Sequence, residues 1–202
     1  MKNVVFQPWV GKNYHEGING KRVLILGESQ YSDKSKVDCE NFTIDLVESY
    51  INFAAEGGES KKWMPTWTKY AKIWREYSEL KSKSDFWRSV VYYNYCQKFV
   101  TKTRKPPNRE NWESGKQAFI DVLEKYKPDV VFGWGMRLRK NMLFDSVKIG
   151  GHGMNKHDKY FEYTLKPTSR KVIPIYFTHH PSAPSFKNKN YAKLIKYALD
   201  IN

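Results

Sequence analysis

Residues 22–27 read Arg-Val-Leu-Ile-Leu-Gly, a short apolar run that a glycine ends. A continuous apolar run of this length is typical of a strand that is buried on both faces of a sheet. Such a strand needs other strands on either side and helices above and below it. The run therefore predicts a central strand of an α/β fold.

Three later stretches have the apolar, β-branched and aromatic content of further strands: 89–96, 129–135 and 171–178. Pro174 interrupts the last stretch and favours an edge position or a bulge, because proline donates no ladder hydrogen bond. We also expect an outer strand at 160–165 and a flexible turn at 150–153.

Apolar residues at helical spacing occur between the predicted strands. The segments with this pattern are 41–55, 61–77, 111–126, 136–143 and 191–199. Strands alternating with helices predict an α/β three-layer sandwich around a central, mostly parallel four-stranded sheet. The sequence shows no linker, repeat or low-complexity segment, so residues 1–202 are expected to form one domain.

The composition excludes several classes of protein. Hydrophobic residues make up 40% and aromatic residues 16% of the chain, enough for a core and too many for a disordered protein. No apolar run approaches the roughly 20 residues of a membrane helix, and no signal peptide is recognisable, so we expect a cytoplasmic monomer without membrane attachment. Cys39 and Cys96 are too few for a disulfide framework or an iron–sulfur cluster, and no metal or cofactor is expected.

The net charge of +14 is unevenly distributed. Residues 1–60 carry 6 basic and 9 acidic side chains, whereas residues 61–112 carry 13 and 4. The basic segment is also rich in Trp and Tyr, and cations interleaved with rings are typical of nucleic-acid binding. A lysine-rich surface over an aromatic core explains the same composition, so charge alone leaves both interpretations open.

Polar residues stand at the ends of three predicted strands: Glu28, Asn94 and His180. Ligands of parallel sheets bind beyond the carboxyl ends of the strands. A carboxylate there can orient and deprotonate a water, a neutral imidazole can donate a hydrogen bond to a developing anion, and an amide can bind a base edge. Each residue alone has a structural explanation, as a cap, a loop contact or a strand amide.

The order of the motifs changes this assessment. The chain carries Gly27-Glu28-Ser29, then the Asn94 strand with Pro106-Pro-Asn-Arg109, and finally His180-Pro-Ser182. Over residues 22–190 this order resembles the uracil-DNA glycosylase superfamily, and the first motif is closest to the Gly-Glu-x form of its iron–sulfur branch. The cysteines of that branch are absent, so no cluster is expected. The resemblance implies an enzyme that extrudes a nucleotide from DNA and hydrolyses the bond between base and deoxyribose.

The resemblance also implies roles for individual residues. Glu28 would position or activate the attacking water, and His180 would stabilise the departing base. The residues expected around the base are Gly27, Ser29, Tyr31, Phe42 and Asn94, with the Phe42 ring stacked on it. The residues expected on the DNA backbone are Arg109, Ser182, Ser185 and Lys187, with 183–186 pressed into the groove. Further cations that are candidates for phosphate contacts are Lys98, Lys102, Arg104 and Lys105.

Departures from the family pattern leave the base and the reaction open. Ser29 replaces the aspartate of the Gly-Gln-Asp-Pro-Tyr form, so water activation depends on Glu28. Ser-Gln-Tyr after Gly-Glu changes the wall facing position 5 of a pyrimidine, so the base is uracil or another deaminated or modified base. The alternative is a catalytically inactive nucleic-acid-binding protein with the same fold, which a salt bridge holding Glu28 away from the cleft would favour. A third class is an α/β enzyme acting on free nucleotides.

Overall fold

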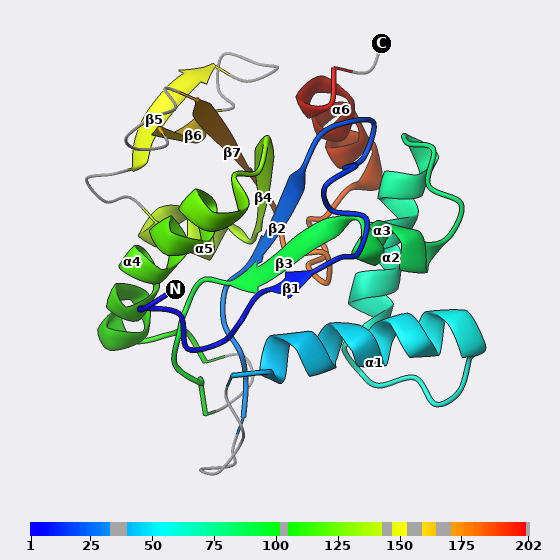
Figure 1. The fold of residues 1–202 in the computed structure, drawn as a ribbon, viewed down its shortest axis with the longest axis horizontal. Coiled ribbons are helices and arrows are strands. Elements are labelled where there is room, and N and C mark those ends of the chain that lie inside the picture. The colour runs from blue at the N-terminus through cyan, green and yellow to red at the C-terminus, as the bar shows by residue number, and fades with distance from the viewer. Residues whose placement is uncertain (33–39, 102–104, 143–146, 153–158, 165–170, 201–202) are drawn as a thin grey trace.

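A seven-stranded sheet runs through the protein (Figure 1). The computed structural model describes residues 1–32, 40–101, 105–142, 147–152, 159–164 and 171–200. The strands are β1 (Trp9–Val10), β2 (Val23–Gly27), β3 (Val90–Asn94), β4 (Val130–Trp134), β5 (Val147–His152), β6 (Lys159–Thr164) and β7 (Val172–Thr178). Their order across the sheet is β1-β3-β2-β4-β7-β6-β5.

Four neighbouring strands, β3, β2, β4 and β7, are parallel to one another, whereas β1, β6 and β5 pair antiparallel at the two edges. Every residue of β2, β3 and β4 is buried, as their apolar sequences predict. The predicted α/β class is confirmed. The predicted sheet of four strands is too small, because antiparallel strands extend it on both sides.

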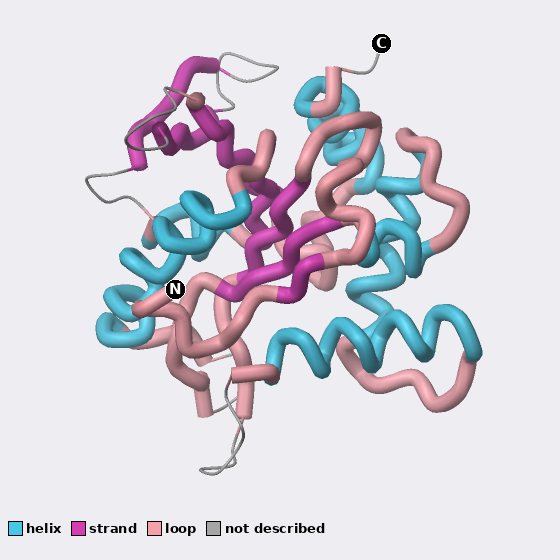
Figure 2. Tube along the Cα trace, viewed as in Figure 1, coloured by secondary structure: helices cyan, strands magenta, loops and turns pink. Residues whose placement is uncertain are grey.

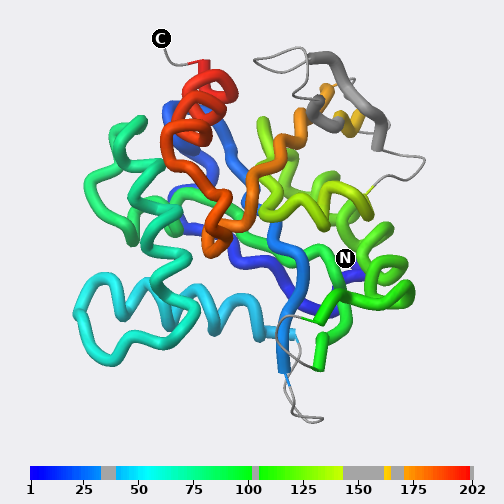
Figure 3. Tube along the Cα trace, turned by 180° about the vertical axis from the view of Figure 1, so that it is seen from behind, coloured from blue at the N-terminus to red at the C-terminus, as the bar shows by residue number. Residues whose placement is uncertain are grey.

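Six described helices cover the two faces of the sheet (Figure 2). They are α1 (Phe42–Glu56), α2 (Met64–Glu76), α3 (Lys83–Arg88), α4 (Arg109–Tyr126), α5 (Met136–Asn141) and α6 (Asn188–Ala198). One face packs against α1, α2, α3 and α6, and the other against α4 and α5. Figure 3 shows from behind that the last helix, α6, lies beside α2.

Local signals explain where several helices begin. Ser82 and Asp85 form a reciprocal capping box at the start of α3, a helix that the apolar periodicity does not predict. Asn108 and Asn111 form the equivalent box at the start of α4. Arg109 is therefore the first residue of a helix that the sequence predicts to begin at residue 111.

Two predictions about the strands are wrong. Pro174 lies in β7, which is flanked by β4 and β6 and is not an edge strand. The proline is tolerated because the ladder with β4 starts at Ile175, one residue later. The turn predicted at 150–153 is largely strand, since residues 150–152 belong to β5, whose pairing with β6 contains a register shift. Gly153, and the predicted element ends at Leu143 and Leu165, lie outside the described residues.

The parallel arrangement brings the carboxyl ends of β2, β3, β4 and β7 to one edge of the sheet. The first of these strands in the chain, β2, has β3 on one side and β4 on the other. This reversal of direction is the kind of switch point at which open α/β sheets bind ligands. Within the described residues, no helix has the length and apolarity needed to cross a bilayer.

Candidate functional site

A pocket of about 750 Å³ lies where the four parallel strands end. The predicted site residues that line it are Gly27, Glu28, Ser29, Tyr31, Asn94, His180 and Ser182. They come from the last residue of β2 and the loop after it, from the last residue of β3 and from the loop after β7. Residues far apart in the chain thus meet at one concave surface, as the motif order predicts.

Backbone hydrogen bonds hold the loop that carries Glu28. The Cys96 N–H donates to the Glu28 carbonyl at 2.9 Å, and the Val100 N–H donates to the Gln30 carbonyl at 2.9 Å. The buried Gln30 side chain donates to Thr43 Oγ1 at 2.6 Å, which ties the loop to α1. The chain after β2 therefore continues to pair with the chain after β3, and Glu28 stands on a rigid support.

Asn94 depends on a glycine beside it. A Cβ atom on Gly27 would lie 2.1 Å from Asn94 Oδ1, so only glycine leaves room for this amide. The Tyr92 hydroxyl donates to the same Oδ1 at 3.4 Å. Burial raises the pKa of Tyr92, so its hydroxyl keeps the proton that it donates. Gly27 and Tyr92 together fix the orientation of the Asn94 amide.

A second buried amide, Gln97, supports the strand end from behind. Its Nε2 donates to the Asn94 carbonyl at 2.9 Å. Its Oε1 accepts from the Val5 N–H at 2.9 Å and from the Phe6 N–H at 3.1 Å. The side chain thus connects the N-terminal segment to the residue that bears the pocket amide.

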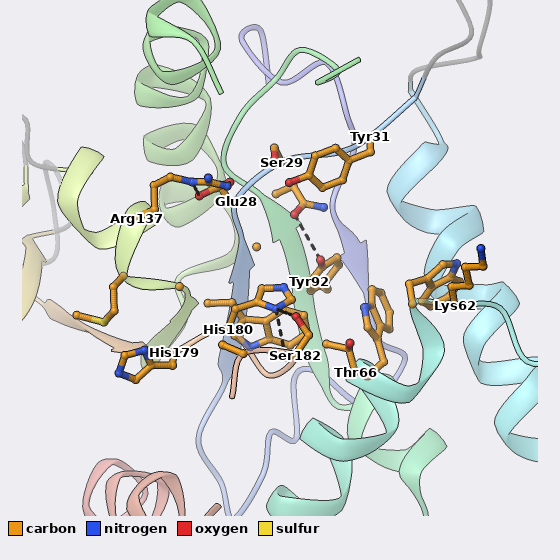
Figure 4. A pocket seen from close by; sticks show the side chains of 18 residues that line it. Glu28, Ser29, Tyr31, Lys62, Thr66, Tyr92, Arg137, His179, His180 and Ser182 are labelled. Carbon is orange, nitrogen blue, oxygen red and sulfur yellow. Dashed lines mark hydrogen bonds and ion pairs between the residues drawn. The ribbon is translucent and has the colours of Figure 1, made fainter. Parts of the chain in front are cut away.

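Glu28 forms an ion pair with Arg137, a residue in the first turn of α5 that also lines the pocket (Figure 4). Arg137 Nε donates to Glu28 Oε2 at 2.7 Å, and Nη2 donates to Oε1. The Glu28 side chain is 12% exposed and that of Arg137 is 43% exposed. The hydrogen bond with Glu28 raises the pKa of Arg137, with smaller contributions from the Glu28 and Tyr31 charges.

This ion pair restricts the chemistry of Glu28 without removing it from the pocket. A carboxylate has roughly four lone-pair positions, and Arg137 occupies one on each oxygen. The remaining positions can accept from a water, but the guanidinium lies against both carboxylate oxygens. Glu28 is therefore suited to orient a water and to supply negative charge, while strong proton abstraction needs Arg137 to move.

His180 has a defined tautomer. Ser182 Oγ lies 2.7 Å from His180 Nδ1, and the Ser182 backbone N–H donates to the same nitrogen at 3.2 Å. An amide N–H only donates, so Nδ1 is the acceptor and the neutral ring carries its proton on Nε2. Solvent reaches the ring, yet the surrounding protein desolvates it and lowers the pKa of His180, with opposite smaller effects of Glu28 and Arg137. His180 is thus a neutral Nε2–H donor at neutral pH.

The pocket has an aromatic wall. Its rings are Trp63 and Trp67 of the α2 segment, Tyr92 of β3 and Trp134 of β4. Trp134 meets the His180 ring edge to face, with centroids 5.9 Å apart. Figure 4 shows Glu28 and Arg137 across the pocket from Lys62 and Thr66, which directly precede Trp63 and Trp67 in the chain. The pocket thus combines the Glu28–Arg137 ion pair with an aromatic wall beside which Lys62 lies.

Phe42, the ring predicted to stack on a base, is not among the residues that line this pocket. It begins α1 and packs against Phe99, with centroids 5.0 Å apart, and against Phe6 at 6.4 Å. This placement follows from the start of the helix, which turns the ring toward the N-terminal segment. The rings that line the pocket are those of Tyr31, Trp63, Trp67, Tyr92 and Trp134.

The residues predicted to contact DNA divide in the same way. Ser182 lines the pocket, whereas Arg109, Ser185 and Lys187 do not. Ser185 Oγ lies 3.0 Å from Nδ1 of His179, and both Arg109 and Lys187 are exposed to solvent.

The expectation that 183–186 presses into the groove does not hold for Phe186. This ring is only 4% exposed and stacks on Tyr191 at 4.4 Å. Lys69 Nζ lies 4.7 Å from the ring centroid on top of it. Of the further cations, Lys98 pairs with Glu110, and Lys102 and Arg104 lie outside the described residues.

Several pocket residues escape prediction from the sequence: Lys62, Trp63, Thr66, Trp67, Trp134, Arg137 and His179. One signal existed for Arg137, which is a basic residue in the first turn of a helix directly after a glycine-ended strand. Within the described ranges, no group of three or more His, Cys, Asp or Glu residues is arranged to hold a metal ion. Neither a scan of the chain against models of known families nor a search of curated proteins finds a match.

Proposed function

We propose that the protein is a DNA glycosylase that hydrolyses the N-glycosidic bond of a flipped uracil or other deaminated or modified base. The observation that carries this proposal is that Glu28, Asn94 and His180, from the ends of three strands, line one pocket. We further propose that the chain is a diverged member of the uracil-DNA glycosylase superfamily. The four parallel strands at the centre of the layered sheet support that assignment.

The reaction requires opposite charges at the two ends of the breaking bond. As the bond between C1′ and the base nitrogen breaks, its electron pair leaves with the base and the sugar becomes cationic. The Glu28 carboxylate stabilises the cation and orients the water that adds to C1′. The Nε2–H of neutral His180 donates to the base oxygen that gains negative charge. The water loses a proton and the released base takes one up, so the overall reaction is hydrolysis.

The aromatic half of the pocket is suited to hold a base outside the helix. Stacking on the tryptophans offsets part of the few kcal/mol that unstacking costs, and the Asn94 amide binds the base edge. Pockets of about 300–1,000 Å³ bury ligands of drug size, and this one falls within that range. A pocket bounded by α2 leaves room for a base that is larger than an unmodified pyrimidine.

An oligonucleotide assay tests the proposal. Duplex and single-stranded DNA with uracil, hypoxanthine, xanthine or a bulky modified pyrimidine is incubated with the protein, and abasic sites are then cleaved. We expect release of at least one base by the wild-type chain and by Glu16→Gln, a matched change at an exposed carboxylate away from the pocket. Glu28→Gln is expected to lose most of the activity. A wild-type chain that releases none of these bases contradicts the proposal.

The Glu28–Arg137 pair favours a second candidate, a catalytically inactive nucleic-acid-binding protein. A carboxylate with both oxygens held by a guanidinium is already neutralised, and a binding protein needs nothing more from it. DNA binding without base release from any substrate would favour this candidate. One chain supplies the pocket, so in either case we propose a protein that acts on DNA as a monomer, in the cytoplasm as the sequence predicts.

A further inference from the structure

The two partners of the pocket ion pair differ in their access to solvent. Arg137 keeps 43% of its side chain exposed, whereas Glu28 keeps 12%. The guanidinium has five N–H donors, and the hydrogen bonds to Glu28 use those on Nε and Nη2. A ligand that enters the pocket therefore meets an accessible cation with donors to spare before it meets the carboxylate.

The arginine fork matches a phosphate as well as it matches a carboxylate. Both anions accept two parallel N–H bonds from a guanidinium, and arginine is over-represented where phosphate is bound. The pair is open to solvent on its arginine side, because the Arg137 side chain is 43% exposed, so an incoming anion can reach the guanidinium before Glu28 is displaced. An anion that brings its own charge to the pocket can therefore compete with Glu28 for Arg137.

We propose that Arg137 is a phosphate-binding residue of this site, and that a backbone phosphate of the substrate draws it away from Glu28. The ion pair is then the resting state, and both carboxylate oxygens are released from the guanidinium only when a nucleic acid occupies the pocket. The inference rests on the proposed function for the identity of the ligand as DNA. It also explains how an apparently neutralised carboxylate can belong to an active enzyme.

The proposal makes Glu28 a competitor of DNA, because both bind the same guanidinium. Removing the Glu28 charge should therefore strengthen DNA binding, and only while Arg137 is present. A double-mutant cycle detects this dependence directly. Its four proteins are the wild-type chain, Glu28→Gln, Arg137→Gln and the double variant.

Binding is measured by fluorescence anisotropy with a labelled oligonucleotide, over a series of salt concentrations. We expect Glu28→Gln to bind about 3- to 10-fold more tightly, and Arg137→Gln to bind about 10-fold more weakly. We expect the double variant to bind like Arg137→Gln alone. Log affinity falls linearly with log salt concentration. The magnitude of this negative slope should be smaller by about one in Arg137→Gln, the value for one phosphate contact.

Lys140→Gln is the matched control. This substitution removes the same charge from the same helix. Lys140 is exposed and does not line the pocket. Its effect on binding should add to that of Glu28→Gln. Arg137→Lys keeps the charge and should recover most of the salt slope, and circular dichroism checks that each variant is folded.

Two results of the double-mutant cycle would overturn the proposal. One is independent, additive effects of Glu28→Gln and Arg137→Gln, and the other is an Arg137→Gln protein with wild-type affinity and salt slope. Parallel titrations with dUMP and inorganic phosphate separate the sources of the phosphate. Arg137-dependent binding of dUMP without such binding of the oligonucleotide would also overturn it, in favour of a free nucleotide.

The cycle needs no turnover, so it fails separately from the proposed function. If the cycle behaves as expected and no base is released, Arg137 binds phosphate in a protein that is not a glycosylase. If a base is released but the effects are additive, the enzyme is real and Arg137 merely holds Glu28 in place.

Discussion

Two carboxylates pair with arginine at opposite ends of the parallel strands. Asp129 lies where the parallel strands begin, directly before β4, and its partners Arg22 and Lys171 directly precede β2 and β7. Glu28 lies where β2 ends, and among the described residues its one cationic partner is Arg137. The two sites use the same chemistry on the two ends of neighbouring strands.

The number of donors distinguishes them. Asp129 accepts from the Arg22 backbone N–H at 2.7 Å, from its guanidinium at 3.2 and 3.3 Å and from Lys171. Partial burial acts to raise the pKa of Asp129, but these hydrogen bonds outweigh it and lower the pKa to about 2. The Asp129 carboxylate accepts from residues that precede β2 and β7, so it connects the beginnings of three strands and stabilises the fold. A carboxylate with one exchangeable partner at a pocket is available for function.

The largest expected effect is on the rate of base release and follows from a change at Glu28. Glu28→Gln should slow single-turnover base release by about 10²- to 10³-fold, because the amide cannot balance the cationic sugar. Asp129→Asn should release base at the wild-type rate per folded molecule. Quenched-flow assays measure base release by both variants. Equal losses of rate in the two would contradict the different roles of Glu28 and Asp129.

The next effect concerns the donor opposite Glu28. His180→Ala should lose about 10²-fold in base release, and His180→Asn should lose less because its amide still donates. The pKa of His180 lies below its ordinary value of 6.5, so release should hold at pH 7 and decline only as pH falls through that lowered pKa. Protonation there turns Nδ1 into a donor that opposes the Ser182 N–H. A rate that rises on acidification would contradict the neutral-donor role.

Asp129→Asn should lower the free energy of unfolding by about 1–3 kcal/mol at pH 7, since it removes the negative charge that Arg22 and Lys171 both contact. The folded pKa of about 2 lies below the ordinary 3.8. The carboxylate therefore stabilises the fold above about pH 4, and that contribution is lost as pH falls toward 2. Urea unfolding at pH 7 and pH 2 tests this, and a variant whose loss of stability is as large at pH 2 as at pH 7 would be inconsistent with it.

The smallest effect marks the limit of the pocket. Phe42→Leu nearly conserves volume in the cluster with Phe6 and Phe99, so the free energy of unfolding should fall by about 1 kcal/mol. Base release should stay at the wild-type rate. A selective loss of base release would show that Phe42 reaches the base after all.

Elements with strong local signals could be predicted from the sequence. The buried runs around Val23, Val90 and Val130 became neighbouring parallel strands, because apolar runs between helices have few other ways to be buried. β1 could not be found, since Trp9–Val10 is too short for any periodicity. The capping-box residues Ser82 and Asp85 are a local signal for the start of α3. A helix of six residues, however, has too few apolar positions for its periodicity to be recognised.

The candidate site shows the same division. Glu28, Asn94 and His180 line one pocket because each lies at the end of a parallel strand or within two residues of it. Trp67 could not be separated from the core, since its ring does pack on Trp87 while it also lines the pocket. The partnership of Glu28 with Arg137 spans 109 residues and depends on where α5 points, which no local pattern contains.

The Gln97 bridge offers a way to observe the pocket from outside. The amide protons of Val5 and Phe6 both end on Gln97 Oε1, and the other end of that side chain is bonded to the Asn94 carbonyl. A displacement of the Asn94 strand end on ligand binding will change the shielding and the exchange of these two protons. Their resonances thus serve as spectroscopic reporters of base capture that no ligand atom touches, and an affinity tag placed close to Val5 would silence them.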